Sequence, residues 1–308
     1  MITFGGQGRI HSVLSSSNCE TFRENCYLAQ GMDVLLRCKG KTLDLSVPRV
    51  MGVLNVTPDS FSDGGQYLDP NAAIDRVARM VAEGAAIVDI GGESTRPGAQ
   101  PVSAEQELAR VVPVIEAVTA RFDVVVSIDT SKPEVMRAAT QAGAALINDV
   151  RALRLPGALA AAAESGAAVC LMHMQGEPGD MQRAPAYENV ISDVAAFLRA
   201  RSQACLSAGI SADALLVDPG FGFGKSLEHN LALLRELRAL LALGLPLLVG
   251  LSRKSMLGAL VGTDPGDRLA ASVAAATLAV WNGACVVRAH DVAATVQALA
   301  VCNAVKLQ

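Results

Sequence analysis

The sequence has few of the features that mark secreted, membrane-spanning or metal-stabilised proteins. Its 7 cysteines are scattered over 308 residues and none are spaced as Cys-x-x-Cys, so neither a disulfide framework nor a structural zinc site is indicated. No apolar run approaches the roughly 20 residues that span a bilayer. The net charge of -4 leaves no positive footprint for nucleic acid or for an anionic membrane surface. These absences predict buried thiols, a cytoplasmic location, no nucleic-acid partner and no membrane partner.

The N-terminal segment also lacks a clear signal. Residues 1–31 show no helical or strand periodicity and no cationic start followed by an apolar region, which argues against a secretory signal peptide. We predict that residues 1–31 form a poorly ordered leader or a cloning-derived extension. With 51% hydrophobic residues and no internal linker, residues 32–308 are expected to form one domain with a large core.

Short apolar runs alternate with longer helical segments from about residue 49 onward. The runs are RVMGVLNV, AIVDIGG, VVVSIDT, ALINDV, AAVCLMHM, LLVDPG, PLLVGLS and CVVRAHD. Because they are continuous, they are typical of strands buried on both faces of a parallel sheet. Helix signals follow, such as the Asp69-Pro70 pair, the Ser103–Gln106 capping box and the glycine-closed segment 226–244. Eight strand–helix units in about 250 residues predict a single-domain α/β protein with a (β/α)8 TIM barrel, and a doubly wound open sheet is the alternative.

Polar residues interrupt each apolar run at its C-terminal end. They are Asn55, Asp89 and Glu93, Asp129, Asn148 and Asp149, His173, Asp218, Arg253 and Lys254, and Arg288 and His290. In barrels of this class the reactive groups come from the C-terminal strand ends and the loops after them. The pattern therefore predicts a binding or catalytic mouth there, although scattered strand-end capping would explain part of it.

Two stretches indicate anion binding. Arg288 and His290 are two residues apart, so they project to the same side of a strand, and such a cation pair suits a phosphate or diphosphate. A helix is expected to begin at Ser255, where free N–H groups would bind a carboxylate or phosphate. The alternatives are a surface arginine with a capped histidine, and an exposed basic turn.

The stretch DPGFGFGKS looks like a phosphate loop but does not match one. Walker A requires a glycine where this sequence has Pro219. The glycines would instead let a flat ligand approach the backbone, and Phe221 or Phe223 could cover its ring.

Three neighbouring strand ends suggest what such a ligand would present. Asp129 and Asp218 offer carboxylates and Asn148 offers an amide. Together these groups would accept hydrogen bonds from the donor-rich edge of a guanidine-like heterocycle. His173 is equally compatible with a structural and a functional role.

The motifs as a set resemble the dihydropteroate synthase family, in order over residues 49–300. They are MGVLNVTPDSFSDGG, DIGGESTRPGA, SIDTSKPEV, INDV, LMHMQG, DPGFGFGK, GLSRKSMLG and RAHDV. The resemblance implies a (β/α)8 barrel, usually a homodimer, that uses Mg²⁺. It implies a reaction that joins 6-hydroxymethyl-7,8-dihydropterin diphosphate to p-aminobenzoate, giving 7,8-dihydropteroate and diphosphate. Sulfonamides would compete for the p-aminobenzoate site.

The resemblance also assigns roles to residues at matching positions. The pterin would be bound by Asp129, Asn148, Met172, Asp218, Gly222, Lys254 and Arg288. The diphosphate would be held by Asn55, Arg288 and His290, with Asn55 also the Mg²⁺ ligand. The p-aminobenzoate site would comprise Phe61, Thr95, Pro97 and Ser255. The catalytic residues would be Asp63, Asp129, Lys254 and Arg288.

Other classes of protein remain as alternatives. A related barrel that transfers a methyl group from methyltetrahydrofolate should lack the diphosphate residues, so the Arg288–His290 pair argues against it. A catalytically inactive pterin-binding paralogue should show decay in the two loops at 55–66 and 93–101, and none is evident. A nucleoside-triphosphate binder is disfavoured by the displaced glycine.

Overall fold

The computed structural model describes most of the chain from residue 34 onward. The described ranges are 34–57, 70–94, 100–177, 179–262, 264 and 267–306. The predictions made for the segment 1–31 and for the Asp69 cap therefore lie outside the described residues.

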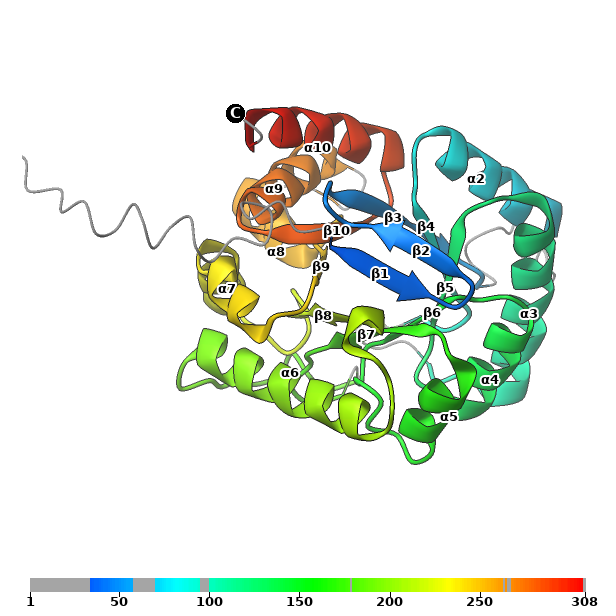
Figure 1. Ribbon diagram of the computed structural model, residues 1–308. Helices are drawn as coiled ribbons and strands as arrows, with labels where there is room; N and C mark the ends of the chain where they lie inside the picture. Colours follow the sequence, from blue (N-terminus) through cyan, green and yellow to red (C-terminus); the bar gives the residue numbers. More distant parts are fainter. Residues whose placement is uncertain are drawn as a thin grey trace, which may run out of the picture.

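Eight parallel strands close into a barrel, in the order β10-β3-β4-β5-β6-β7-β8-β9 (Figure 1). The strands are β3 Arg49–Asn55, β4 Ile87–Gly91, β5 Val125–Asp129, β6 Leu146–Asp149, β7 Ala168–Met172, β8 Leu215–Asp218, β9 Leu247–Gly250 and β10 Ala284–Ala289. All eight coincide with the predicted apolar runs. Because β10 pairs with both β9 and β3, the sheet has no free edge, so the predicted (β/α)8 barrel is confirmed and the open sheet is wrong.

Helices surround the barrel, as Figure 1 shows. They are α2 Pro70–Ala82, α3 Ala104–Arg121, α4 Pro133–Gln141, α5 Ala158–Ser165, α6 Val190–Ser207, α7 Leu227–Arg235, α8 Ser255–Val261, α9 Leu269–Trp281 and α10 Val292–Lys306. The predicted capping box at Ser103 and Gln106 is present at the start of α3. Among these described helices, none is both long and apolar enough to cross a bilayer.

The single helix predicted over residues 226–244 is wrong. The chain forms α7, departs from helical geometry at Glu236, and continues as the 3₁₀ helix η4 over Leu237–Leu243. Leu237 and Leu240 are both fully buried. A spacing of three places both side chains on one face of the 3₁₀ helix, so the segment buries them together.

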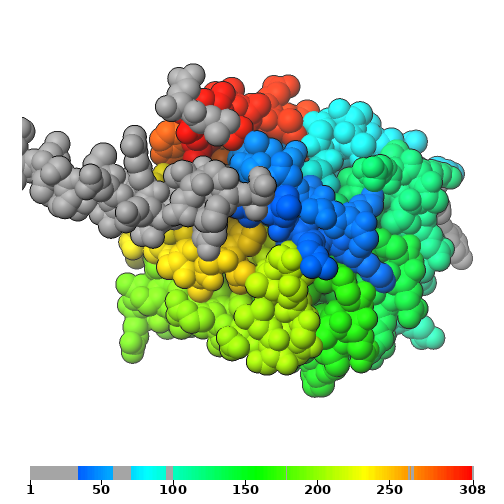
Figure 2. All heavy atoms as spheres, viewed as in Figure 1, coloured from blue at the N-terminus to red at the C-terminus, as the bar shows by residue number. Residues whose placement is uncertain are grey.

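A short hairpin that the sequence did not predict closes one end of the barrel. Strands β1 (Leu35–Cys38) and β2 (Lys41–Asp44) pair antiparallel. Leu36 and Cys38 pack against inward-facing side chains near the N-terminal ends of the strands, such as Met51. The hairpin lies across the centre of this face in the ribbon and space-filling views (Figures 1 and 2). Access from solvent is therefore left to the opposite, C-terminal end.

Alternation along each strand separates the helix-facing core from the barrel interior. On β5, Val126 and Ile128 face the helices, whereas Val125, Ser127 and Asp129 face the interior. Inward-facing side chains are apolar near the hairpin and polar at the other end. The fold thus collects polar groups at one mouth.

Candidate active site

A buried ion cluster lies inside the barrel near its C-terminal mouth. The Arg288 Nε donates to Asp89 Oδ2 at 2.6 Å, and Arg288 Nη2 donates to Asp129 Oδ2 at 2.8 Å. The Asn148 Nδ2 donates to the same Asp89 oxygen at 3.1 Å. Burial lowers the pKa of Arg288, but Asp89 and Asp129 outweigh burial and raise it, so the guanidinium stays charged. The predicted site residues Arg288, Asp129 and Asn148 therefore meet in one cluster, which also contains Asp89.

Asp89 belongs to this cluster, although the sequence motifs assign it no binding or catalytic role. It stands opposite Ser127 in the register of β4 and β5, one layer below Asp129. The residue is fully buried, and its Oδ1 has no hydrogen-bond partner among the described residues. The sequence signal that could have revealed this role is the acidic residue inside the apolar run AIVDIGG, because buried carboxylates are rare unless they are paired.

Asp218 provides a second carboxylate at the mouth. Its Oδ1 accepts from the Gly220 backbone N–H at 2.7 Å, and the residue is 5% exposed. Burial raises the pKa of Asp218 to about 6, against the backbone bond and the positive charge of Lys254. Burial also disfavours the charged form of Lys254, and for a lysine this lowers the pKa, here to about 8. Asp218 and Lys254 therefore lie close enough to influence each other's charge.

The residues predicted to line a slot for a flat ligand lie near Lys254. The Lys254 ammonium is 4.1 Å from the centre of the Phe223 ring. Gly222 has φ +79, and a Cβ there would lie 3.2 Å from the Lys254 side chain. Met172 packs in the same small cluster as Phe223. Phe221 is buried in the core, so Phe223 is the aromatic residue that could cover a ligand.

Asn55 and His290 lie at neighbouring strand ends. Asn55 pairs in register with Gly91, whose missing Cβ would lie 3.9 Å from Asn55 Oδ1 and 3.7 Å from Asp129 Oδ2. His290 follows β10 and its Nδ1 is 3.0 Å from Ser252 Oγ. The amide oxygen of Asn55 thus faces the same mouth as the ion cluster.

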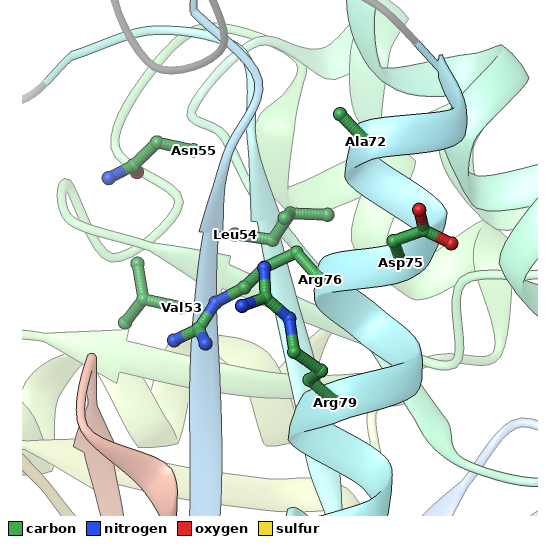
Figure 3. Close-up of a pocket in the computed structure, with 7 residues that line it drawn as sticks. All are labelled: Val53, Leu54, Asn55, Ala72, Asp75, Arg76 and Arg79. Atoms are coloured by element: carbon green, nitrogen blue, oxygen red, sulfur yellow. The ribbon is translucent and has the colours of Figure 1, made fainter.

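An open recess of about 480 Å³ adjoins Asn55 between β3 and α2. Figure 3 shows the Arg76 and Arg79 side chains running from α2 across to β3, while Asp75 points away. The Arg76 Nη2 donates to the His290 carbonyl oxygen at 2.7 Å. Positive charge is therefore concentrated beside Asn55 and His290, two of the three residues predicted to hold diphosphate.

Other predicted site residues separate into three groups. Arg253 forms two hydrogen bonds to Asp291, at 3.0 and 2.6 Å. Its guanidinium is therefore paired with Asp291 rather than placed beside Lys254. Ser255 is the exposed first residue of α8. The remaining predicted residues lie outside the described residues, and they are Phe61, Asp63, Thr95 and Pro97.

This arrangement combines two kinds of recognition within one mouth. Carboxylates at Asp129 and Asp218 with the Asn148 amide would accept from a donor-rich heterocycle. Arg288, His290 and the recess arginines would attract an anionic group. Among the described residues there is no cluster of three histidine, cysteine or acidic side chains suited to a metal ion.

Comparison with known proteins identifies the family. A model of the family described as "Pterin binding enzyme" matches residues 51–290. Dihydropteroate synthase of Escherichia coli strain K12 is 53% identical over 269 residues, which cover 87% of this chain and 95% of that protein. The Haemophilus influenzae enzyme is 54% identical, with coverage of 87% and 98%.

Solved structures give the same result. Dihydropteroate synthase of Xanthomonas albilineans with 4-aminobenzoic acid superposes with a TM-score of 0.85 at 53% identity, covering 90% of this chain and all of that one. A Yersinia pestis dihydropteroate synthase complexed with a sulfonamide drug gives 0.85 at 52% identity, with coverage of 89% and 100%. The chain belongs to the dihydropteroate synthase family of pterin-binding enzymes.

Proposed function

We propose that this chain joins 6-hydroxymethyl-7,8-dihydropterin diphosphate to p-aminobenzoate, giving 7,8-dihydropteroate and diphosphate. The observation that carries the proposal is the meeting of Asp129, Asn148 and Asp218 with the charged Arg288 at one barrel mouth. A relative from Xanthomonas albilineans, 50% identical, was solved in complex with 7,8-dihydropteroate. The site and the relatives support the same reaction.

The acceptor groups would hold the pterin ring. Asp218 has one carboxylate oxygen on the Gly220 N–H and a second oxygen to offer to ring N–H and amino groups. Asn148 and Asp129 would accept from neighbouring positions, and Met172 and Gly222 would line the slot. Lys254 would extend from above Phe223 toward the ring edge.

The reaction we propose breaks the bond between the pterin methylene carbon and the diphosphate oxygen first. Both bonding electrons leave with the diphosphate, whose charge is stabilised by Arg288, His290 and Asn55. The Arg288 Nη1 has no partner among the described residues and is available to that oxygen. The amine nitrogen of p-aminobenzoate then attacks the methylene cation, forms the C–N bond and releases a proton. Asp129 and Asp218 would stabilise the cation, with Asp63 as the predicted loop carboxylate.

A magnesium ion fits the proposed site as a companion of the substrate. Mg²⁺ is commonly held by one or two protein oxygens together with substrate phosphates and water. Asn55 contributes one such oxygen at the mouth, beside Asp129. When bound, Mg²⁺ would neutralise charge on the diphosphate.

The p-aminobenzoate site is proposed at the rim of the mouth. Ser255 at the start of α8 would hold the carboxylate, and Phe61, Thr95 and Pro97 remain predicted members of the site. The sulfonamide complex of the Yersinia pestis relative supports the expectation that sulfonamides compete there.

The proposed reaction can be distinguished from its alternatives by diphosphate release. The purified chain is mixed with pterin diphosphate, p-aminobenzoate and Mg²⁺, and diphosphate is measured with time. The synthase predicts release that requires both substrates and is inhibited by a sulfonamide. An inactive paralogue would bind pterin without release, and a methyltransferase would release no diphosphate but demethylate methyltetrahydrofolate.

Positive charge in the recess should assist capture of the diphosphate substrate. Arg79→Gln is expected to raise the KM for pterin diphosphate about threefold at low salt, with kcat unchanged, because Arg79 is exposed at the rim rather than within the mouth. The difference should shrink as salt is added. Arg235→Gln, an exposed arginine at the end of α7, is the matched control. An equal KM for the parent and Arg79→Gln at low salt would contradict this role.

We propose a homodimer formed through α9 and α10. Helix α9 carries no charged residue, and its exposed Leu278 and Trp281 lie near exposed Val301 and Val305 of α10. The two helices are held together there, since the Lys306 Nζ donates to the Val280 carbonyl. An apolar helix with an exposed face indicates an interface.

Light scattering coupled to gel filtration tests this interface. The parent chain should elute as a dimer, and Leu278→Lys should convert it to a monomer because a buried charge would be left unpaired. Leu206→Lys on α6, another exposed leucine, should leave the dimer intact. A monomeric parent would contradict the proposal.

A cytoplasmic location is also proposed. The five cysteines that the structure describes are free and buried, as predicted for thiols in a reducing compartment.

A further inference from the structure

Lys225 is a buried lysine for which the proposed reaction has no use. It follows the glycine-rich loop after β8 and is 3% exposed. Lysine is rarely buried unless it is paired, yet no carboxylate among the described residues forms an ion pair with Lys225. Burial lowers the pKa of Lys225 to about 7, although the charge of Asp218 opposes this shift, so the buried ammonium has to be stabilised by other groups.

Three acceptors lie within 3.0 Å of the Lys225 Nζ, and a fourth, the His173 carbonyl oxygen, lies at 3.4 Å. The Lys225 Nζ donates to the carbonyl oxygens of Gly220 at 2.9 Å and Phe223 at 3.0 Å, and lies 3.0 Å from His173 Nδ1. An ammonium has three N–H groups, so this set satisfies it fully. Burial, aided by the charge of Lys225, lowers the pKa of His173 to about 3, so the imidazole is neutral. Its Nδ1 is then an acceptor and Nε2 carries the proton.

His173 is itself held by aromatic packing. Its ring lies 5.0 Å from Phe197 in an edge-on arrangement and 6.0 Å from Tyr187. The Tyr187 hydroxyl donates to the Gly224 carbonyl at 2.7 Å. Tyr187 therefore contacts His173 and also holds the C-terminal end of the glycine-rich loop after β8. The histidine that the sequence left undecided is thus a buried support for Lys225.

The contacts of Lys225 lead directly to the slot. The Gly220 residue whose carbonyl meets Lys225 donates its N–H to Asp218 Oδ1 at 2.7 Å. Phe223, whose carbonyl also meets Lys225, places its ring under Lys254. The Gly222 N–H between them donates to Asn230 Oδ1 at 2.7 Å. Hydrogen bonds to Asp218, Lys225 and Asn230 therefore hold the backbone of this loop at Gly220, Gly222 and Phe223.

Close packing on one side prevents the loop from moving inward. A Cβ on Gly220 would collide with the His173 carbonyl oxygen, so the loop packs directly on the end of β7. Removing the ammonium would leave two carbonyls without their donor in a buried place, which favours a shift of the loop.

We propose that Lys225, supported by His173, is a positioning residue of the pterin slot. Its ammonium draws the Gly220 and Phe223 carbonyls inward and so aims the Asp218 carboxylate and the Phe223 ring at the ligand. This inference rests on the proposed function, since it takes pterin as the occupant of the slot. Lys225 acts through the loop and touches no reacting atom.

The test compares two ligands on one variant. Lys225→Met keeps the length of the side chain and removes its donors. Calorimetry should show affinity for 6-hydroxymethylpterin reduced about tenfold or more, because the slot is misaligned, and affinity for inorganic diphosphate within about twofold of the parent. Lys39→Met is the matched control, since the Lys39 Nζ donates to the Thr140 carbonyl at the hairpin end. It should leave both affinities unchanged.

Two further measurements separate positioning from a loss of folding. Lys225→Ala with added n-propylammonium, which replaces the three missing carbons and the nitrogen, should regain pterin affinity, whereas n-propanol should not. If Lys225→Met does not fold, His173→Phe keeps the ring packing, removes the acceptor and should weaken pterin binding alone.

Three outcomes would overturn the inference. They are unchanged pterin affinity in Lys225→Met, equal losses for both ligands, and no rescue by the amine. If the parent chain itself binds no pterin, the proposed function fails instead.

Discussion

Asp218→Asn should bind 6-hydroxymethylpterin about 100-fold more weakly than the parent, as measured by calorimetry. The substitution keeps the shape of the side chain but replaces one acceptor oxygen with a donor N–H. A ring that presents only donors to this position then meets a donor, and a charge-assisted hydrogen bond is lost. Affinity for inorganic diphosphate should be unchanged because that ligand is held by other residues. Pterin affinity within threefold of the parent would contradict the assignment.

The same variant should be more stable than the parent at neutral pH. Burial raises the pKa of Asp218 from 3.8 to about 6, so ionising it in the fold costs free energy. The cost is absent below the unfolded pKa, grows between about pH 4 and 6, and is fully present above that range. Urea unfolding should therefore favour Asp218→Asn above about pH 7 and show no difference below about pH 4. A less stable variant at neutral pH would show that the hydrogen bonds and charges around the carboxylate outweigh the cost of burying it.

Arg288→Gln should lower kcat/KM by about 1,000-fold or more, since the group that neutralises the leaving diphosphate is removed. It should also lower the free energy of unfolding by about 3 kcal/mol, because Asp89 is fully buried and would lose its partner. Steady-state kinetics and urea unfolding measure the two effects separately.

A double variant distinguishes the two roles of Arg288. Asp89→Asn combined with Arg288→Gln removes the buried charge as well as its partner, so much of the lost stability should return. Turnover should not return, because the guanidinium is still missing. Parental turnover in the double variant would mean that Arg288 serves only to neutralise Asp89.

The barrel and most of its mouth were predictable because they depend on local patterns. Each continuous apolar run formed a strand, and the polar residue at its end was placed by the rule that parallel strands end at one edge. Asp129, Asn148 and Arg288 therefore meet although they are far apart in the chain.

The rest depends on contacts that spacing does not encode. The hairpin at residues 35–44 is too short to show a period, and only its packing on the barrel floor reveals it. The buried pairing of Lys225 with His173 joins residues 52 positions apart, and the glycine-rich stretch that contains Lys225 does not reveal its partner. Asp89 was visible as a polar residue, but its place below Asp129 follows from strand register.

Formation of 7,8-dihydropteroate by the purified chain is the decisive measurement for the proposed synthase. The chain is incubated with pterin diphosphate, p-aminobenzoate and Mg²⁺, and the product is identified by mass spectrometry. We predict dihydropteroate in amounts exceeding the enzyme, and none from the Arg288→Gln variant at the same time point. Absence of dihydropteroate from the folded parent chain, with both substrates present, would contradict the proposed function.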